Sequence, residues 1–198
     1  MSQVSGSVTN LQNSSEASDA STAKMDWISL ALLILVAVAS RFIPHPPNFT
    51  AVGAVALLGG YLFRRLDLRL AMVIPMVAMF ISDLFLGFHP VMLFVYIGMM
   101  LATVVGFALR KQKALWLILG ALSSSVIFFA LSNLGVWLVA GYYEQTWAGL
   151  VQCFAMAIPF FKNQLAGDVV WTAGLYAVHQ AAQRFSTVGA AASAPSTN

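Results

Sequence analysis

The sequence contains few charged residues and only one cysteine. Charged residues make up 9% of the 198 residues, whereas hydrophobic residues make up 60%, and the mean hydropathy is +0.82. A soluble domain of this length needs far more polar surface than this composition supplies. The single cysteine, Cys153, excludes a disulfide within these residues. Its apolar setting favours a core residue over a ligand or a nucleophile.

The sequence also lacks the short motifs of nucleotide and metal chemistry. It has no glycine-rich phosphate loop, so we expect no nucleotide hydrolysis by this chain. It has no His/Cys spacing typical of a metal site, so we expect no metal and no cofactor. The pI of about 9.2 comes from basic residues between the apolar stretches, and it indicates membrane orientation rather than nucleic-acid binding.

Long apolar stretches separated by short polar breaks run from Trp27 to Arg184. A helix of about 20 apolar residues crosses the roughly 30 Å hydrocarbon core of a bilayer, and it satisfies its own backbone hydrogen bonds there. We therefore predict an all-α integral membrane protein, multi-pass in the inner (cytoplasmic) membrane. The six predicted transmembrane helices cover residues 27–43, 48–63, 69–87, 91–109, 114–139 and 163–184.

The remaining segments are assigned by length and composition. The stretch Trp147 to Phe161 contains Pro159 and is short for a full span, so we predict an extra re-entrant or interfacial helix there. If this stretch were a full span, the chain would have seven spans and its C-terminus would lie on the other side of the membrane. The polar segments 1–25 and 186–198 are predicted to be disordered tails around one helical domain, 26–185. Although Ala37-Val38-Ala39 resembles a signal cleavage site, the acidic leader argues that the first helix is retained.

The signs of the charges in the breaks predict which side each break faces. Eight of the ten Lys and Arg residues fall on one side of the six-span arrangement, and they are Lys24, Arg64, Arg65, Arg69, Arg110, Lys111, Lys113 and Arg184. The opposite breaks, 44–48, 88–90 and 141–144, contain no Lys or Arg. By the positive-inside rule the basic side is cytoplasmic, with both termini inside.

Polar residues within or beside the apolar stretches gather near the predicted outer face. Buried ionisable groups in a membrane are costly unless they pair or face water, so their convergence predicts an outward-opening pocket with aromatic walls. The candidate substrate-binding residues are Arg41, His45, Asn48, Asp83, His89, Asn133, Trp137, Lys162, Asn163, Asp168 and Trp171. No catalytic residue is predicted.

Each candidate also has a purely structural interpretation. Arg41 and Lys162 could extend to lipid headgroups, and Asp83 could form a structural ion pair with Arg41. Asn133 could join helices through a hydrogen bond, and the tryptophans could belong to an interfacial belt. Small residues recur every four positions at Gly98, Ala102 and Gly106, at Ala173, Ala177 and Ala181, and at Ala56 and Gly60. Such stripes favour close helix packing within the chain, or otherwise docking of a partner.

Four segments carry a resemblance to a known family: Arg41 to Thr50, Ser82 to Gly87, Asn133 to Trp137, and Pro159 to Asp168. They resemble an uncharacterised bacterial family of proposed membrane transport proteins, over nearly all of residues 27–184. That family is in turn distantly similar to the substrate-binding S components of energy-coupling-factor transporters. The resemblance implies a six-helix fold, an outward-facing site for a small, vitamin-like solute and a separate energising transmembrane/ATPase module. The first helix lacks the Ala-x-x-x-Ala spacing with which S components often dock that module.

We therefore expect a transport protein whose partners are the lipid bilayer and a small solute, with no nucleic acid. Arg41 and Lys162 would meet an anionic group of the solute, and Asp83 and Asp168 a cationic or hydrogen-bonding group. A proton-coupled carrier using one of these carboxylates is a further mechanism. The alternatives are an intramembrane enzyme that uses Asp83 and Asp168 as a carboxylate pair, and a non-transporting membrane scaffold subunit.

Overall fold

The protein is described here by a computed structural model, in which residues 27–63 and 67–192 are described, with side chains as far as Phe185. Within these ranges the chain forms only helices and their connections, so the all-α prediction is confirmed. The predicted tail 1–25, the loop residues 64–66 and the end of the predicted tail 186–198 lie outside the described residues. The helices are Trp27–Ser40, α2 (Val52–Leu62), α3 (Leu68–Leu86), α4 (Met92–Ala108), α5 (Trp116–Val139) and α6 (Trp147–Ala192).

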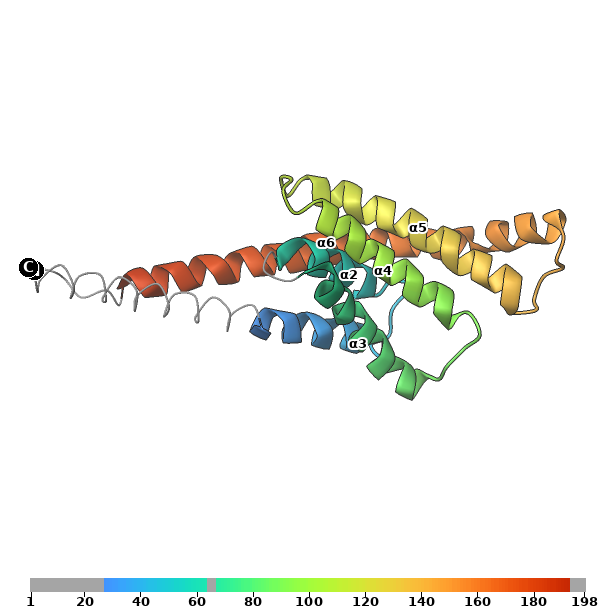
Figure 1. Ribbon diagram of the computed structural model, residues 1–198, viewed down its shortest axis with the longest axis horizontal. Coiled ribbons are helices and arrows are strands. Elements are labelled where there is room, and N and C mark those ends of the chain that lie inside the picture. Colours follow the sequence, from blue (N-terminus) through green and yellow to red (C-terminus); the bar gives the residue numbers. More distant parts are fainter. Residues whose placement is uncertain (1–26, 64–66, 193–198) are drawn as a thin grey trace, which may run out of the picture.

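Successive helices alternate in direction, which places the connections at two ends of an elongated bundle (Figure 1). The segments between the first helix and α2, between α3 and α4, and between α5 and α6 lie toward the right of that view. The connection between α4 and α5, which contains Arg110, Lys111 and Lys113, lies toward the left. The basic connection at 110–113 thus lies at the other end of the bundle from three connections whose one Lys or Arg residue is Arg41.

The short helix α2 forms the centre of the bundle. Nine of its 11 residues are buried, and it packs against α3, α4, α5 and α6. A helix of 11 residues is only about 16 Å long, so α2 fills part of the bundle's length. Its first residues, Val52 and Gly53, line the cavity described below. The shortness of α2 therefore leaves room for a cavity inside the bundle.

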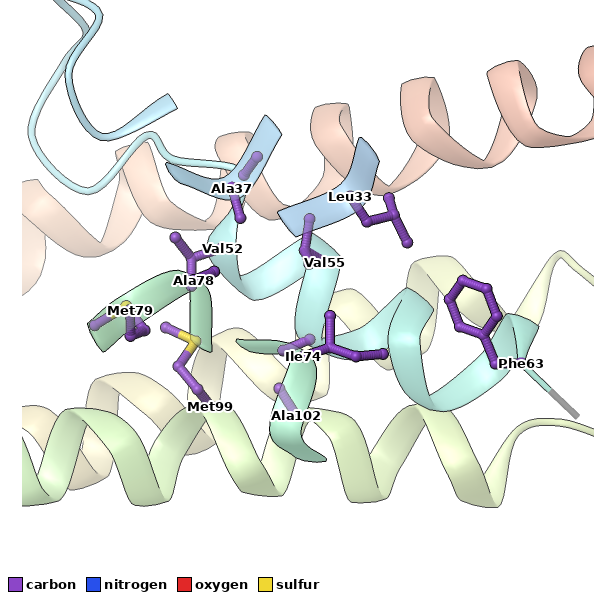
Figure 2. Packing of buried hydrophobic residues seen from close by; sticks show 12 residues of the cluster. Leu33, Ala37, Val52, Val55, Phe63, Ile74, Ala78, Met79, Met99 and Ala102 are labelled. Atoms are coloured by element: carbon purple, nitrogen blue, oxygen red, sulfur yellow. The ribbon is translucent and has the colours of Figure 1, made fainter. Parts of the chain in front are cut away.

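Small residues let α2 and α4 approach closely, as the stripe on α4 predicted. A Cβ added at Gly106 would lie 1.9 Å from the carbonyl oxygen of Leu57, and one added at Gly60 would lie 2.2 Å from that of Thr103. Ala102, midway along the stripe, is buried in the cluster that also contains Val55 and Ile74 (Figure 2). The α4 stripe therefore packs within the chain. The α6 stripe differs, because Ala173, Ala177 and Ala181 are all exposed.

The last helix corrects one prediction. The stretch Trp147 to Phe161 is not a separate re-entrant or interfacial helix, because α6 runs without a break from Trp147 to Ala192 and has Pro159 inside it. Proline removes one backbone hydrogen bond without necessarily ending a helix. The polar residues Lys162 and Asn163, which suggested a break, are compatible with helical backbone. The helix also continues past residue 184, where the last span was predicted to end.

Two helices, α3 and α5, are long and apolar enough to cross a membrane, with mean hydropathies of 1.8 and 1.9. The first helix, α2 and α4 are apolar but shorter. Length and composition of these elements therefore indicate membrane association.

Candidate functional site: a polar cavity inside the helical bundle

A cavity of about 340 Å³ lies among the first residues of α2 and the facing parts of α3, α4, α5 and α6. Its apolar wall includes Met79, Val95, Met99, Ala102 and Phe128. Its polar lining comes from two connections and two helices that are far apart in the sequence, and consists of Arg41, His45, Asn48, Thr50, His89, Ser124, Gln164 and Asp168. The predicted residues Arg41, His45, Asn48, His89 and Asp168 are thus brought together in one place.

The connection from Arg41 to Thr50 is fixed at both of its ends by one side chain. The hydroxyl of Ser40 donates to the carbonyl of Ala37 (2.9 Å) and accepts from the backbone N–H of Ala51 (3.0 Å). Pro44, Pro46 and Pro47 restrict the backbone between these ends, and Asn48 adopts a left-handed conformation with a φ of 65°. This closed loop positions His45 and Asn48 at the cavity.

An ion pair between the first helix end and α3 lies beside the cavity. Nη1 of Arg41 is 2.7 Å from Oδ1 of Asp83 and donates to the hydroxyl of Ser82 at 2.6 Å. The hydroxyl of Tyr96 on α4 donates to Oδ2 of Asp83 at 2.9 Å. The carboxylate is 1% exposed and the Arg41 side chain 17% exposed. Asp83 therefore neutralises Arg41, which corresponds to the structural interpretation of this pair.

Asp168 on α6 contributes a second polar group to the lining. Its Oδ2 accepts a hydrogen bond from the hydroxyl of Ser125 on α5 at 2.6 Å, and it is 6% exposed. Gln164, one turn earlier on α6, donates to the Ser125 carbonyl at 3.2 Å. Gly53 makes this position possible, since a Cβ there would lie 2.2 Å from Oδ1 of Asp168. The absence of a side chain at Gly53 lets the carboxylate lie against α2.

The hydroxyl of Ser124 lines the cavity without a hydrogen-bond partner among the described residues. The Ser124 side chain is 3% exposed. Buried polar groups in folded proteins are normally hydrogen-bonded, and a hydroxyl can both donate and accept. Ser124 is therefore available to a molecule in the cavity.

Asn133 borders a neighbouring space rather than the cavity itself. A second cavity of about 280 Å³ is lined by Asn133 and Ser132, and it shares Asn48, His89 and Phe128 with the first. The side-chain amide of Asn133 donates to the Phe129 carbonyl at 2.8 Å, and its backbone carbonyl accepts from Sγ of Cys153 at 3.4 Å. Both contacts are structural, and they show that Cys153 is a buried packing residue.

Besides Asn133, five predicted residues lie outside the lining of the cavity. Asp83 does not line the cavity itself but pairs with Arg41, which does. Trp137 donates through Nε1 to the carbonyl of Glu144, in the connection before α6, at 2.9 Å. Lys162 is exposed and Asn163 is half-buried on α6. Trp171 packs against the hydrophobic cluster of the N-terminal helix and α2, and its Nε1 has no partner in the described part of the chain.

Three polar residues at the cavity were not predicted from the sequence: Ser124, Ser125 and Gln164. Two signals for them were present. The run Ser123-Ser124-Ser125 interrupts the apolar centre of α5, and Gln164 precedes Asp168 by one helical turn, so both lie on the same face of α6. Tyr96 had no such signal, because an isolated tyrosine in an apolar helix gives no indication of its partner.

These features define the class of protein: an all-helical bundle with two apolar helices of membrane-spanning length and an internal polar cavity. The chain belongs to a family of unknown function, DUF6580, which matches residues 21–191. No curated protein and no solved structure matches the chain.

Proposed function

We propose that the protein is a multi-pass membrane protein that binds a small solute in the polar cavity for uptake. The observation that carries this proposal is the convergence of Arg41, His45, Asn48, Ser124 and Asp168 on one cavity of about 340 Å³. That volume is within the range of small-molecule sites, which combine mostly apolar walls with a few polar groups.

The membrane location is supported by the outward-facing surface. Only 39% of the apolar window in α3 and 28% of that in α5 is buried within the bundle. A core helix of a soluble protein would be mostly buried, whereas here Phe80, Leu84 and Phe85 of α3 point away from the bundle and are exposed. Exposed apolar surface on this scale requires an apolar environment. Lipid supplies one.

The orientation rests on the separation of charge between the two ends of the bundle. The basic connection Arg110 to Lys113 lies opposite the loops that hold His45 and His89 (Figure 1). The positive-inside rule then places the basic end in the cytoplasm and the loop residues of the cavity outside. Under this orientation the cavity takes up its solute from the outer face.

The contacts of the two buried carboxylates favour binding over carboxylate-pair catalysis. Asp83 is held by Arg41 and Tyr96, whereas Asp168 is held by Ser125. No hydrogen bond joins the two carboxylates among the described residues, although a pair that shares a proton needs one. The chain also carries no phosphate-binding loop, so its transport would draw on an ion gradient or on a separate energising subunit.

The proposal is tested by identifying the solute and following its uptake. Mass spectrometry of small molecules retained after mild detergent purification is expected to detect one compound enriched over an unrelated membrane protein. Cells producing the wild-type protein should then accumulate that compound in isotope-labelled form. Ser124→Leu fills the cavity and should abolish uptake, whereas Ser123→Leu is a matched control because Ser123 is exposed on the same helix. A folded wild-type protein that retains no solute would contradict the proposal.

A further inference from the structure

The charges around the cavity do not balance. Arg41 contributes a positive charge, but the buried carboxylate of Asp83, 2.7 Å from it, already neutralises that charge. Asp168 contributes a carboxylate to the lining, and among the described residues no Lys or Arg side chain forms an ion pair with it. Its polar contacts, Ser125 and Gln164, are uncharged. Besides the imidazoles of His45 and His89, the lining therefore carries one carboxylate that no Lys or Arg pairs with among the described residues.

Burial makes this imbalance significant. Asp168 is 6% exposed, and a buried carboxylate without a cation is destabilising. The side chains of Ser125 and Gln164 that contact this carboxylate are neutral, so they do not supply the positive charge that would offset its burial. A protein that retains such a group at a cavity wall has an acceptor available for a ligand that brings the missing positive charge.

A second, independent group points into the same cavity. The hydroxyl of Ser124 is buried and has no hydrogen-bond partner in the described residues, and it lies on α5 next to Ser125, the residue that holds Asp168. The aromatic ring of Phe128, one helical turn further along α5, is part of the same lining. An aromatic face attracts cations, so carboxylate, hydroxyl and ring together match a cation that carries N–H donors and some apolar surface.

The lining disfavours a bare metal ion as that cation. Metal ions need several oxygen, nitrogen or sulfur ligands converging on one point. The described residues contain no group of three or more His, Cys, Asp or Glu side chains that could hold a metal. Much of the cavity wall consists of apolar side chains such as Val95 and Met99.

We propose that the cavity binds a small organic cation, a compound with an ammonium group or a protonated ring nitrogen, whose positive charge pairs with the carboxylate of Asp168. The hydroxyl of Ser124 takes one further hydrogen bond, and Phe128 covers part of the apolar body. This inference rests on the proposed solute-binding function, and it assigns that site a class of ligand. Arg41 then acts as the internal partner of Asp83, and the selective charge is that of Asp168.

The test uses three probes of one shape and different charge: benzylammonium, benzyl alcohol and benzoate. Binding to the purified full-length protein is measured in detergent by thermal stabilisation at increasing probe concentrations. Benzylammonium is expected to bind at least about tenfold more tightly than the other two, a difference that corresponds to about 1.4 kcal/mol. Equal binding of the three, a preference for benzoate or benzyl alcohol, or no binding of benzylammonium would overturn the assignment.

Asp168→Asn provides the matching variant. Its amide can donate to Ser125 Oγ, and the one hydroxyl proton of Ser125 can then be donated to the Ala121 carbonyl, 2.9 Å away, so the packing is preserved. The variant is expected to lose the preference for benzylammonium and, without ligand, to unfold at the same or a higher temperature than the wild-type protein. Retention of the full preference by Asp168→Asn would contradict the role of the carboxylate.

The failure of this inference is distinguishable from the failure of the proposed function. If the compound retained during purification is neutral or anionic, the cation assignment is wrong while solute binding stands. If no compound is retained and none of the three probes binds, both are wrong.

Discussion

Arg41 and Asp83 form an ion pair between the end of the first helix and α3, with Nη1 and Oδ1 2.7 Å apart. The two residues are 42 positions apart in the sequence, and the pair ties the loop that lines the cavity to a long apolar helix. Tyr96 donates to the other carboxylate oxygen at 2.9 Å, so three helical segments share this contact. The pair therefore fixes the position of the cavity-lining loop relative to α3 and α4.

Removal of one partner of this pair should destabilise the protein strongly. Arg41→Met leaves the Asp83 carboxylate buried and unpaired, and it is expected to lower the free energy of unfolding by about 3–5 kcal/mol. The combined variant Arg41→Met with Asp83→Leu should recover much of this loss, because replacement of a whole buried pair by apolar side chains is often near neutral. Reversible unfolding in mixed micelles measures both values. Lys162→Met, at an exposed position, is the control. If it lowers the free energy of unfolding as much as Arg41→Met does, the loss does not come from the unpaired Asp83 carboxylate.

The contact between α2 and α4 depends on the absence of a side chain at Gly106. Gly106→Ala places a methyl group 1.9 Å from the Leu57 carbonyl oxygen, so the helices must separate, at a cost of about 1–3 kcal/mol. Gly174→Ala is the matched control, since a Cβ there meets nothing within 4 Å and alanine favours helix by about 1 kcal/mol. Thermal unfolding should show opposite shifts for the two variants. Equal shifts would mean that the packing of α2 against α4 does not limit stability.

The orientation of the bundle is accessible to chemical labelling. In a Cys153→Ser background, single cysteines at His45 and Glu144 should react with a membrane-impermeant thiol reagent in intact cells. A cysteine at Gln112, in the basic connection, should react only after the cells are opened. Labelling of position 112 from outside would reverse the orientation and remove the argument for uptake from the outer face.

Apolar patterning predicted most of the helices, because each helix coincides with a run of apolar residues and each connection interrupts such a run. The predicted bounds 69–87 and 91–109 compare with Leu68–Leu86 and Met92–Ala108 in the structure. The pattern failed at α6 because a proline and two polar residues resemble a boundary, whereas helical backbone tolerates all three. Whether a helix continues through such residues is decided by the packing around them.

The candidate site was predictable only in part. A sequence pattern indicates how far along a helix a polar residue lies, but it does not indicate which neighbouring helix or cavity its side chain faces. Arg41 and Asp168 were found because ionisable residues are rare in apolar stretches. Trp137 was also selected, yet it lies twelve residues beyond Ser125 on α5, and its indole donates to the Glu144 carbonyl instead of lining the cavity. Ser124 was missed because serine is common in helices that pack closely, and its lack of a partner is visible only once the surrounding side chains are placed.

Native mass spectrometry of the intact protein, released from detergent micelles, shows directly whether the cavity holds a small solute. We expect the wild-type protein to carry one small molecule per chain, Ser123→Leu to carry the same adduct, and folded Ser124→Leu to carry none. A wild-type protein without an adduct, or an adduct retained equally by Ser124→Leu, would mean that the cavity does not bind a solute.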